Sequence, residues 1–369
     1  MKTTNSVYNL CDTEEGIDGN ISVKSKKKYD LIKRIAFASF KLGCLLCFLL
    51  FVILPLVYKF SYKIQQSVVF LNFVSIPKNP DYGNPARYEI QGVRNFYLQT
   101  DDNMMLGVWQ ILSDGVANDT SEFENPEFYE RALRNGDNVI LYNHGNSGHR
   151  VASHRIELYK VLRKRFHVIA YDYRGYGDSS DVNPTEKGLV KDCIFMYKWL
   201  KNKTSGKIFV WGHSLGTGLS THMIAILGKE GIVPSGLILE SPFTSMREEI
   251  SEHPLAQIFK PLPWFHYTVV EPMQVNNFTF ASDRHIMNVD CSILILHAED
   301  DRVVPYKLGY KLYQLASEYR KPSQGTIKFI GFPKKLSYGH KYICRDPELL
   351  NFLKDFESSA LNEAEEKKL

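Results

Sequence analysis

Ser214 lies at the centre of the pentapeptide Gly-His-Ser-Leu-Gly (residues 212–216), the feature that most limits how this chain can fold. The run Lys207–Trp211 before it has the length and apolar character of a buried strand, and Thr217–Leu227 after it begins with small residues and is typical of a helix. Strand, sharp turn and helix together form the setting of a nucleophile elbow, which lifts the hydroxyl above the sheet. The sequence therefore predicts Ser214 as a nucleophile and the backbone N–H of Leu215 as a donor to an oxyanion.

A serine hydroxyl is a poor nucleophile unless a base accepts its proton, and His340 is the candidate for that base. In chains with such an elbow the partners follow in the order serine, acid, histidine. His340 is the one histidine that follows the acids near residue 300. It lies between the apolar run Ile327–Phe332 and the helix-like Pro347–Phe356, where a loop after the last strand is expected.

The acid is expected among Glu299, Asp300 and Asp301, which follow the strand-like run 292–296. Asp301 fits best, because Asp-x-x-Val-Pro places the acid in the loop and the Val-Pro at the start of the next helix. Asp300 is the second candidate and Glu240, after the strand-like Leu237–Leu239, is the third. The acids that are not used would be solvated loop charges or local caps.

A second oxyanion donor is expected in the loop 143–148 (Asn-His-Gly-Asn-Ser-Gly), which follows the strand-like run 138–142. Gly145 would let the backbone come close to a substrate, and the N–H of Asn146 is the predicted donor.

Several motifs, in this order along the chain, resemble an α/β-hydrolase, and more closely the α/β-hydrolase domain-containing protein 12 subfamily. That subfamily consists of membrane-anchored lipases acting on lysophosphatidylserine and monoacylglycerol. The resemblance runs from about Arg94 to Phe356 and carries Ser214, Asp301 and His340 over as the catalytic triad. Arg302 departs from the pattern, since proline is expected there. The motifs are residues 94–98, His-Gly-x-x-Gly at 144–148, 172–179, 212–218, 240–244, 297–301 and 339–343.

Strand-like and helix-like segments alternate from about residue 94, which predicts a mainly parallel, doubly wound sheet with helices on both faces. We expect an α/β-hydrolase fold over residues 94–358, with a cap insertion at about 242–290 and the active residues at the carboxyl ends of the strands. The remaining regions are expected to be a basic tail (1–34), a transmembrane helix (35–58), a juxtamembrane segment (59–93) and a polar tail (359–369).

The run Leu42–Tyr58 has no charged residue and would span roughly 26 Å at ~1.5 Å per residue, so extension back to Ile35 makes it long enough to cross a bilayer. Residues 1–41 carry eight Lys/Arg against five Asp/Glu, which predicts a cytosolic N-terminus and a lumenal or extracellular hydrolase domain, with the endoplasmic reticulum as the expected membrane. The glycosylation candidates on the far side are Asn118, Asn202 and Asn277, whereas Asn20 should stay unmodified.

The net positive charge is concentrated in the N-terminal region, since the rest of the chain is close to neutral, and this argues against a nucleic-acid partner. His144, His149 and His154 lack a matching pair of acids, so we expect neither a metal nor a cofactor. Six cysteines do not make a disulfide framework, although Cys193 and Cys344 could pair.

The sequence thus predicts a membrane-anchored serine hydrolase that cleaves acyl esters of lysophospholipids and monoacylglycerols through an acyl-serine intermediate. The expected partners are a lipid substrate and the membrane, and the oligomeric state is left open. Two alternatives are an acyl-protein thioesterase, whose substrates are usually cytosolic, and a catalytically inactive scaffold of the same fold.

Overall fold

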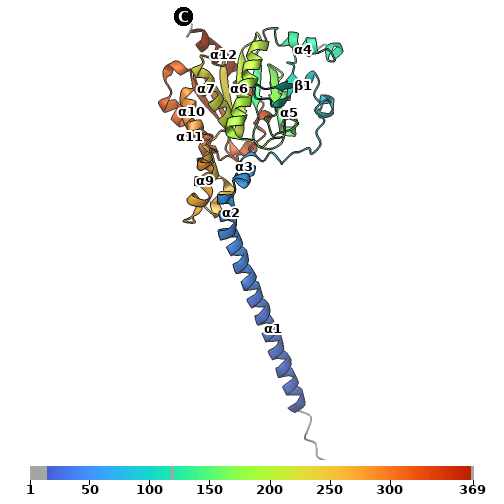
Figure 1. Ribbon diagram of the computed structural model, residues 1–369, viewed down its shortest axis with the longest axis vertical. Coiled ribbons are helices and arrows are strands. Elements are labelled where there is room, and N and C mark those ends of the chain that lie inside the picture. Colours follow the sequence, from blue (N-terminus) through green and yellow to red (C-terminus); the bar gives the residue numbers. More distant parts are fainter. Residues whose placement is uncertain (1–14, 118–119, 367–369) are drawn as a thin grey trace, which may run out of the picture. The chain divides into compact units, whose positions relative to one another are not determined.

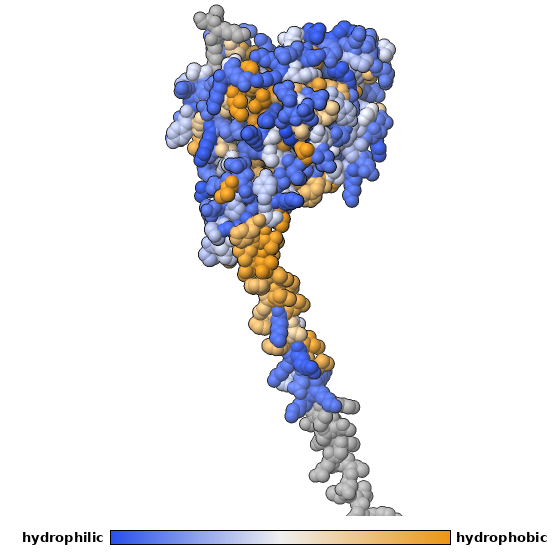
Figure 2. All heavy atoms as spheres, viewed as in Figure 1, coloured by the Kyte–Doolittle hydropathy of each residue, from blue (hydrophilic) through white to orange (hydrophobic). Residues whose placement is uncertain are grey.

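The computed structural model describes residues 15–117 and 120–366, and the chain divides into two compact units, residues 1–57 and 58–369. The first unit holds α1 (Glu15–Phe48), which continues through a π-helical turn (Leu49–Ile53) into α2 (Leu54–Phe60) (Figure 1). Residues 25–60 make a helix long and apolar enough to cross a membrane, with 6% of its most apolar stretch buried. In Figure 2 apolar side chains cover the upper part of this helix, and hydrophilic side chains cover its lower, N-terminal part. The helix is compatible with a single-pass anchor.

The second unit is built on an eight-stranded sheet in the order β1-β2-β4-β3-β5-β6-β7-β8. The pairs β1–β2 and β2–β4 are antiparallel and the others are parallel, as the alternation of strands and helices predicted. Because β3 and β5 are neighbours, the loops that follow them meet at one edge of the sheet. The strands are β1 (Val93–Gln99), β2 (Met105–Ile111), β3 (Val139–Asn143), β4 (His167–Tyr171), β5 (Ile208–His213), β6 (Gly236–Glu240), β7 (Ile293–Ala298) and β8 (Ile327–Phe332).

Helices cover both faces of this sheet, and the alternation of side chains along a strand explains how. Leu141 of β3 packs in one core cluster with residues of α6, α7 and α11, whereas Tyr142 packs in another with residues of α5 and α12. Every residue of β3 to β7 is buried, which is usual for parallel strands covered on both sides. The helices are α5 (Ser153–Leu162), α6 (Glu186–Lys203), α7 (Leu215–Lys229), α11 (Tyr306–Tyr319) and α12 (Leu349–Glu366).

Residues 242–290, which we call the cap segment, connect β6 to β7 through short helices. They are α8 (Met246–Glu252), a 3-10 helix (Pro254–Ile258), a π-helical turn (His266–Val270), α9 (Glu271–Val275), α10 (Ser282–His285) and a 3-10 turn (Ile286–Asn288). The outlying helices are α3 (Tyr62–Phe70) and α4 (Pro126–Ala132).

The strands expected from apolar runs are confirmed, and each is within about two residues of its predicted bounds. Residues 67–70 form the end of α3, which packs on the domain through buried Val69 and Phe70. Gln66 of this helix is also buried and donates to the carbonyl of Pro184 at 2.9 Å. Phe73 and Ile76 beyond it remain exposed.

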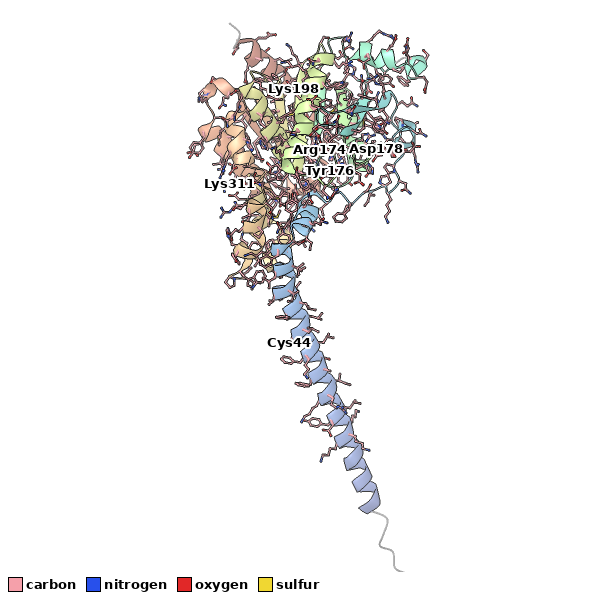
Figure 3. The ribbon with its side chains drawn as sticks, viewed as in Figure 1. Cys44, Arg174, Tyr176, Asp178, Lys198 and Lys311 are labelled. Carbon is pink, nitrogen blue, oxygen red and sulfur yellow. The ribbon has the colours of Figure 1, made fainter. Side chains whose placement is uncertain are left out.

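The turn 172–179 has a structural role. The buried guanidinium of Arg150 donates to Asp172 at 2.5 Å and to Asp178 at 2.6 Å. Arg174 forms a second ion pair with the buried Asp192 at 2.6 Å, and Arg174, Tyr176 and Asp178 gather in the same part of the unit in Figure 3. Removing one partner would leave a buried charge without compensation, at a cost of about 3–5 kcal/mol.

Cys193 and Cys344 are buried free thiols, so the suggested disulfide between them is not formed. Cys291, two residues before β7, is also buried.

Candidate active site

Ser214 sits on a strained turn between the end of β5 and the first residue of α7. Its backbone has φ +52° and ψ −118°, a conformation that a residue with a side chain adopts only when its surroundings enforce it. The turn is held by hydrogen bonds from Ser214 N–H to the carbonyl of Glu240 (2.9 Å) and from Thr217 Oγ1 to the carbonyl of Ser214 (2.6 Å). These contacts fix the geometry that the strand–turn–helix pattern predicted.

Two glycines make room for this turn. A side chain at Gly216 would overlap the backbone carbonyl of Asn143, at the end of the neighbouring strand β3. A Cβ at Gly145 would lie 3.1 Å from the Cβ of Ser214. The end of β3 and the loop after it therefore pack directly on the elbow: glycine is required at position 216, and at position 145 a side chain would crowd Ser214.

His340 and Asp301 form a hydrogen-bonded pair on adjacent loops after β8 and β7. The Nδ1 of His340 lies 2.7 Å from Oδ2 of Asp301. The other carboxylate oxygen of Asp301 accepts the N–H groups of Val303 (2.8 Å) and Val304 (2.9 Å). Arg302, which stands where a proline was expected, is exposed. The hydrogen bonds accepted by Asp301 hold the loop in place of that proline.

The pKa values separate the two buried candidates for the acid. Burial pulls the pKa of Asp301 upward, but His340 and His297 outweigh it and hold that pKa well below its usual range. Burial raises the pKa of Glu240 to about 8, and the nearby Asp301 adds to the rise. At neutral pH Asp301 is thus an anion that can stabilise an imidazolium, whereas Glu240 is largely neutral and accepts a hydrogen bond from Trp211 at 2.9 Å.

The two acids before Asp301 hold the loop that carries His340. Asp300 accepts the N–H of Gly339 at 3.0 Å, and Glu299 accepts the N–H of Lys334 at 3.0 Å. The acids other than Asp301 were expected to be solvated loop charges or local caps, whereas these two bind the facing loop, 35 and 39 residues further along the chain.

His213, which precedes the elbow serine, joins the elbow to the loop of His340. Its Nε2 lies 2.9 Å from the carbonyl oxygen of His340, and the two ring centroids are 4.9 Å apart. Among the described residues no hydrogen bond joins the Ser214 hydroxyl to His340, and the contact of His213 links the elbow to the His340 loop. Position 213 varies in elbow motifs, and nothing in the sequence marked it.

The predicted oxyanion donors, Leu215 and Asn146, lie on either side of the elbow. Among the residues that the structure describes, neither backbone N–H donates a hydrogen bond. The carbonyls of the Asn146 loop are occupied by the buried Arg155, which donates to Gly145 at 3.1 Å and to Ser147 at 2.9 Å. Arg155 thus fixes the loop and leaves the two N–H groups available, and sequence reasoning missed it.

The cap segment brings two further titratable groups to the site. Burial and then the nearby Asp301 carboxylate raise the pKa of Glu249 on α8 to about 7. Burial and then His340 lower the pKa of His253, just after α8. Both groups interact electrostatically with the His340–Asp301 pair, so α8 lies beside the site.

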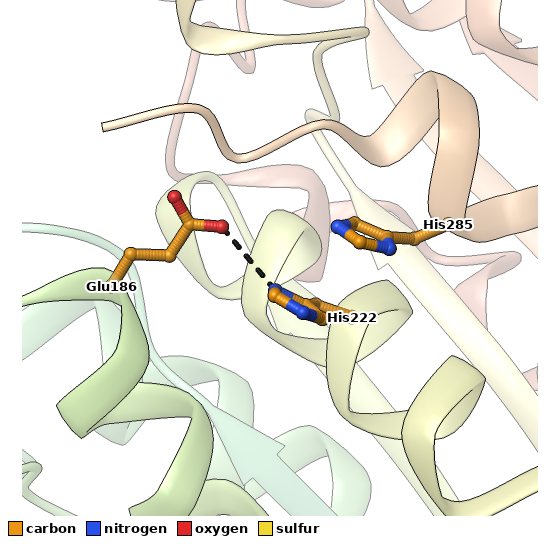
Figure 4. A group of neighbouring side chains, drawn as sticks. All are labelled: Glu186, His222 and His285. Atoms are coloured by element: carbon orange, nitrogen blue, oxygen red, sulfur yellow. Dashed lines mark hydrogen bonds and ion pairs between the residues drawn. The ribbon is translucent and has the colours of Figure 1, made fainter. Parts of the chain in front are cut away.

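The structure also gathers Glu186, His222 and His285, whose ligand atoms lie within 4.8 Å of one another (Figure 4). The histidine rings are stacked, with centroids 3.9 Å apart and planes 11° from parallel. An imidazole binds a metal in its own plane, so one ion cannot serve both rings as they stand. Glu186 instead accepts the N–H groups of Thr279 and Phe280, both at 2.9 Å, and the cluster anchors the end of the cap segment.

Glu240→Gln is expected to flatten the pH dependence of stability. The pKa of Glu240 is raised from 4.5 to about 8, so its contribution to stability is full below the lower value and is lost as the pH rises through the higher one. Glutamine cannot ionise and still accepts a bond from Trp211. The melting temperature, measured between about pH 5 and 9, should fall for the native chain and fall less for the variant, in which Glu249 is left as a buried acid with a raised pKa. Equal declines would contradict the assignment.

The comparisons with known proteins agree with this architecture. Residues 138–290 match the family model described as the alpha/beta hydrolase fold. The chain is 40% identical to lysophosphatidylserine lipase ABHD12 of Danio rerio over 309 residues (83% of this chain, 80% of the relative) and 40% identical to that of Mus musculus over 315 residues (85% and 79%). A solved α/β hydrolase from Vibrio vulnificus aligns with a TM-score of 0.57 at 19% identity, covering 81% of this chain and 94% of that chain, and supports the fold alone. The resemblance drawn from the motifs is confirmed: the chain belongs to the ABHD12 family of α/β-hydrolase-fold proteins.

Proposed function

We propose that this protein is a membrane-anchored serine hydrolase that cleaves acyl esters of lysophospholipids, lysophosphatidylserine among them, and of monoacylglycerols. The observation that carries the proposal is the His340–Asp301 pair beside the strained elbow of Ser214, in a chain 40% identical to lysophosphatidylserine lipases. An ionised acid, a histidine and an elbow serine are the parts that acyl transfer to serine requires.

In this mechanism His340 removes the proton as the Ser214 oxygen bonds to the ester carbonyl carbon. The N–H groups of Leu215 and Asn146 receive the oxyanion. The tetrahedral intermediate collapses, the bond to the glycerol oxygen breaks, and His340 returns the proton to that leaving alcohol. A water molecule, deprotonated by His340, then attacks the acyl-serine and releases the fatty acid, while Asp301 stabilises the imidazolium in both halves.

The test is a panel of lysophospholipids, monoacylglycerols and acyl-thioesters offered to the purified full-length enzyme. Release of fatty acid from the esters, with lysophosphatidylserine among the best substrates, is the expected result. Preference for the thioesters would favour the acyl-protein thioesterase. Failure on all three classes and with a fluorophosphonate probe would favour the inactive scaffold.

We propose that the N-terminus is cytosolic and the hydrolase unit lumenal, in the endoplasmic reticulum. The support is the basic flank before the apolar helix of residues 25–60. Two of the three sequon asparagines, Asn202 and Asn277, are exposed. Asn118 lies outside the described residues.

Glycosidase treatment of the expressed protein is expected to increase its mobility on a gel, because glycan should be attached at some of Asn118, Asn202 and Asn277 and not at Asn20. Protease added to sealed microsomes should trim only the first forty or so residues, as the positive-inside rule predicts. Digestion of the hydrolase unit would show that the topology is inverted.

A further inference from the structure

The most exposed apolar side chains of the hydrolase unit, among the described residues, gather in two segments. Phe60, Phe73 and Ile76 belong to the first, which begins with the last residue of the apolar helix, and Leu255, Ile258, Tyr267 and Val275 belong to the cap segment. Each of these seven, which we call the apolar rim, is 59–78% exposed. Only Tyr319, at 62%, is comparably exposed elsewhere in the described part of the unit.

The two segments are in contact. Asn276 donates to Gln65 at 2.6 Å, and Tyr62 stacks on Phe278 with ring centroids 5.5 Å apart. The Lys59 ammonium lies over the ring of Tyr267. A shallow hollow of about 340 Å³ between the segments is lined by Lys59, Phe60, Tyr62, Tyr267, Glu271, Pro272, Val275 and Asn276. The first segment and α9 with its preceding turn therefore make one surface.

The direct connection of this surface to the apolar helix indicates that a membrane covers it. Phe60 is the last residue of the helix that is apolar enough to cross a membrane. Tyr267 and Val275 line the same hollow as Phe60, so they lie next to the last residue of that helix. Lysines 59, 63 and 260 and Trp264 accompany the rim, and lysines and tryptophan are the residues that favour the boundary between lipid tails and headgroups.

We propose that the apolar rim rests in the surface of the lipid bilayer and that single-chain lipids enter the active site from there, along the cap segment. This inference rests on the proposed function. The same short stretch of chain carries both ends of the route: Glu252 of α8 forms an ion pair with Lys307, six residues after Asp301, and Leu255 follows three residues later on the exposed side. This proximity to the catalytic groups favours a lipid surface over a protein partner.

The test is the double variant Leu255→Asp/Ile258→Asp of the full-length enzyme in vesicles. Charges should keep the rim out of the lipid surface, because burying them there is costly. We expect kcat/KM to fall about tenfold or more for lysophosphatidylserine in phosphatidylcholine vesicles and to change less than about twofold for the water-soluble ester p-nitrophenyl butyrate. The matched control is Tyr319→Asp, which lies before β8, at the sheet edge opposite the elbow, and should change neither rate.

An equal fall for both substrates, or no fall for either, would overturn the proposal. A second measurement does not depend on hydrolysis: a photo-crosslinking phenylalanine placed at position 258 should label vesicle lipid, and one placed at 319 should not. Lipid labelling at 258 by an enzyme that hydrolyses no lipid ester would refute the proposed substrate class and still support the docking surface. Equal labelling at 258 and 319 would refute the docking surface.

Discussion

Replacing Ser214 with alanine should abolish hydrolysis and labelling by a fluorophosphonate probe. The elbow places this hydroxyl at the junction of β5 and α7, in a backbone conformation with φ +52° that neighbouring glycines and hydrogen bonds sustain. Without the hydroxyl there is no oxygen to carry the acyl group, and loss of a triad nucleophile costs on the order of 10⁶ in kcat. Labelling and residual turnover can both be measured on the purified full-length protein.

The control for this variant is Ser241→Ala, because Ser241 also has a positive φ (+52°) at the end of the neighbouring strand β6 and is also buried. It should keep the probe reactivity that Ser214→Ala loses. Continued labelling of the Ser214 variant would show that another serine is the nucleophile.

Asp301→Asn should lower kcat by about 10⁴, because an amide neither stabilises an imidazolium nor holds the base in the right tautomer. The 2.7 Å contact with Nδ1 of His340 is the interaction at stake. In this variant the amide can place an N–H toward His340 where the carboxylate oxygen accepted before. The kcat for a soluble ester, compared between this variant and the two acid variants below, measures the effect.

Asp300→Asn is the matched comparison, one residue away. Asp300 accepts the N–H of Gly339, and an amide oxygen can still do so, so the variant should lose far less activity. Glu240→Gln should likewise remain active, since Glu240 is largely neutral at pH 7. If Asp300→Asn proves the more damaging change, the acid has been assigned to the wrong residue of the loop.

The sequence predicted the features that depend on local pattern. Apolar runs of strand length and small residues at the elbow place β5, Ser214 and α7 without reference to the rest of the chain, because a sharp turn permits only small neighbours. The chain order of serine, acid and histidine then suffices to propose His340. Among three consecutive acids, however, pattern gives only a preference, since which carboxylate faces the histidine depends on the path of the loop after β7.

Residues that act across long sequence separations carry no such pattern. His213 contacts a loop 127 positions later, and Arg155, although only ten positions from Gly145, reaches it from a different element, α5. The Glu186, His222 and His285 cluster likewise forms only after three helices have packed. These side chains meet their partners only when the fold packs and buries the elements that carry them.

The three consecutive acids at 299–301 suggest how sequences of this family can vary. Each acid makes one hydrogen-bonding contact with the facing loop. Glu299 accepts the N–H of Lys334, Asp300 accepts the N–H of Gly339, and Asp301 bonds the ring of His340. The two loops are thus held in register by three consecutive contacts. Inserting or deleting one residue in either loop would shift all three contacts at once. Viable changes of length should therefore arise in pairs, one in each loop, whereas single substitutions at exposed positions such as Arg302 can be accepted freely.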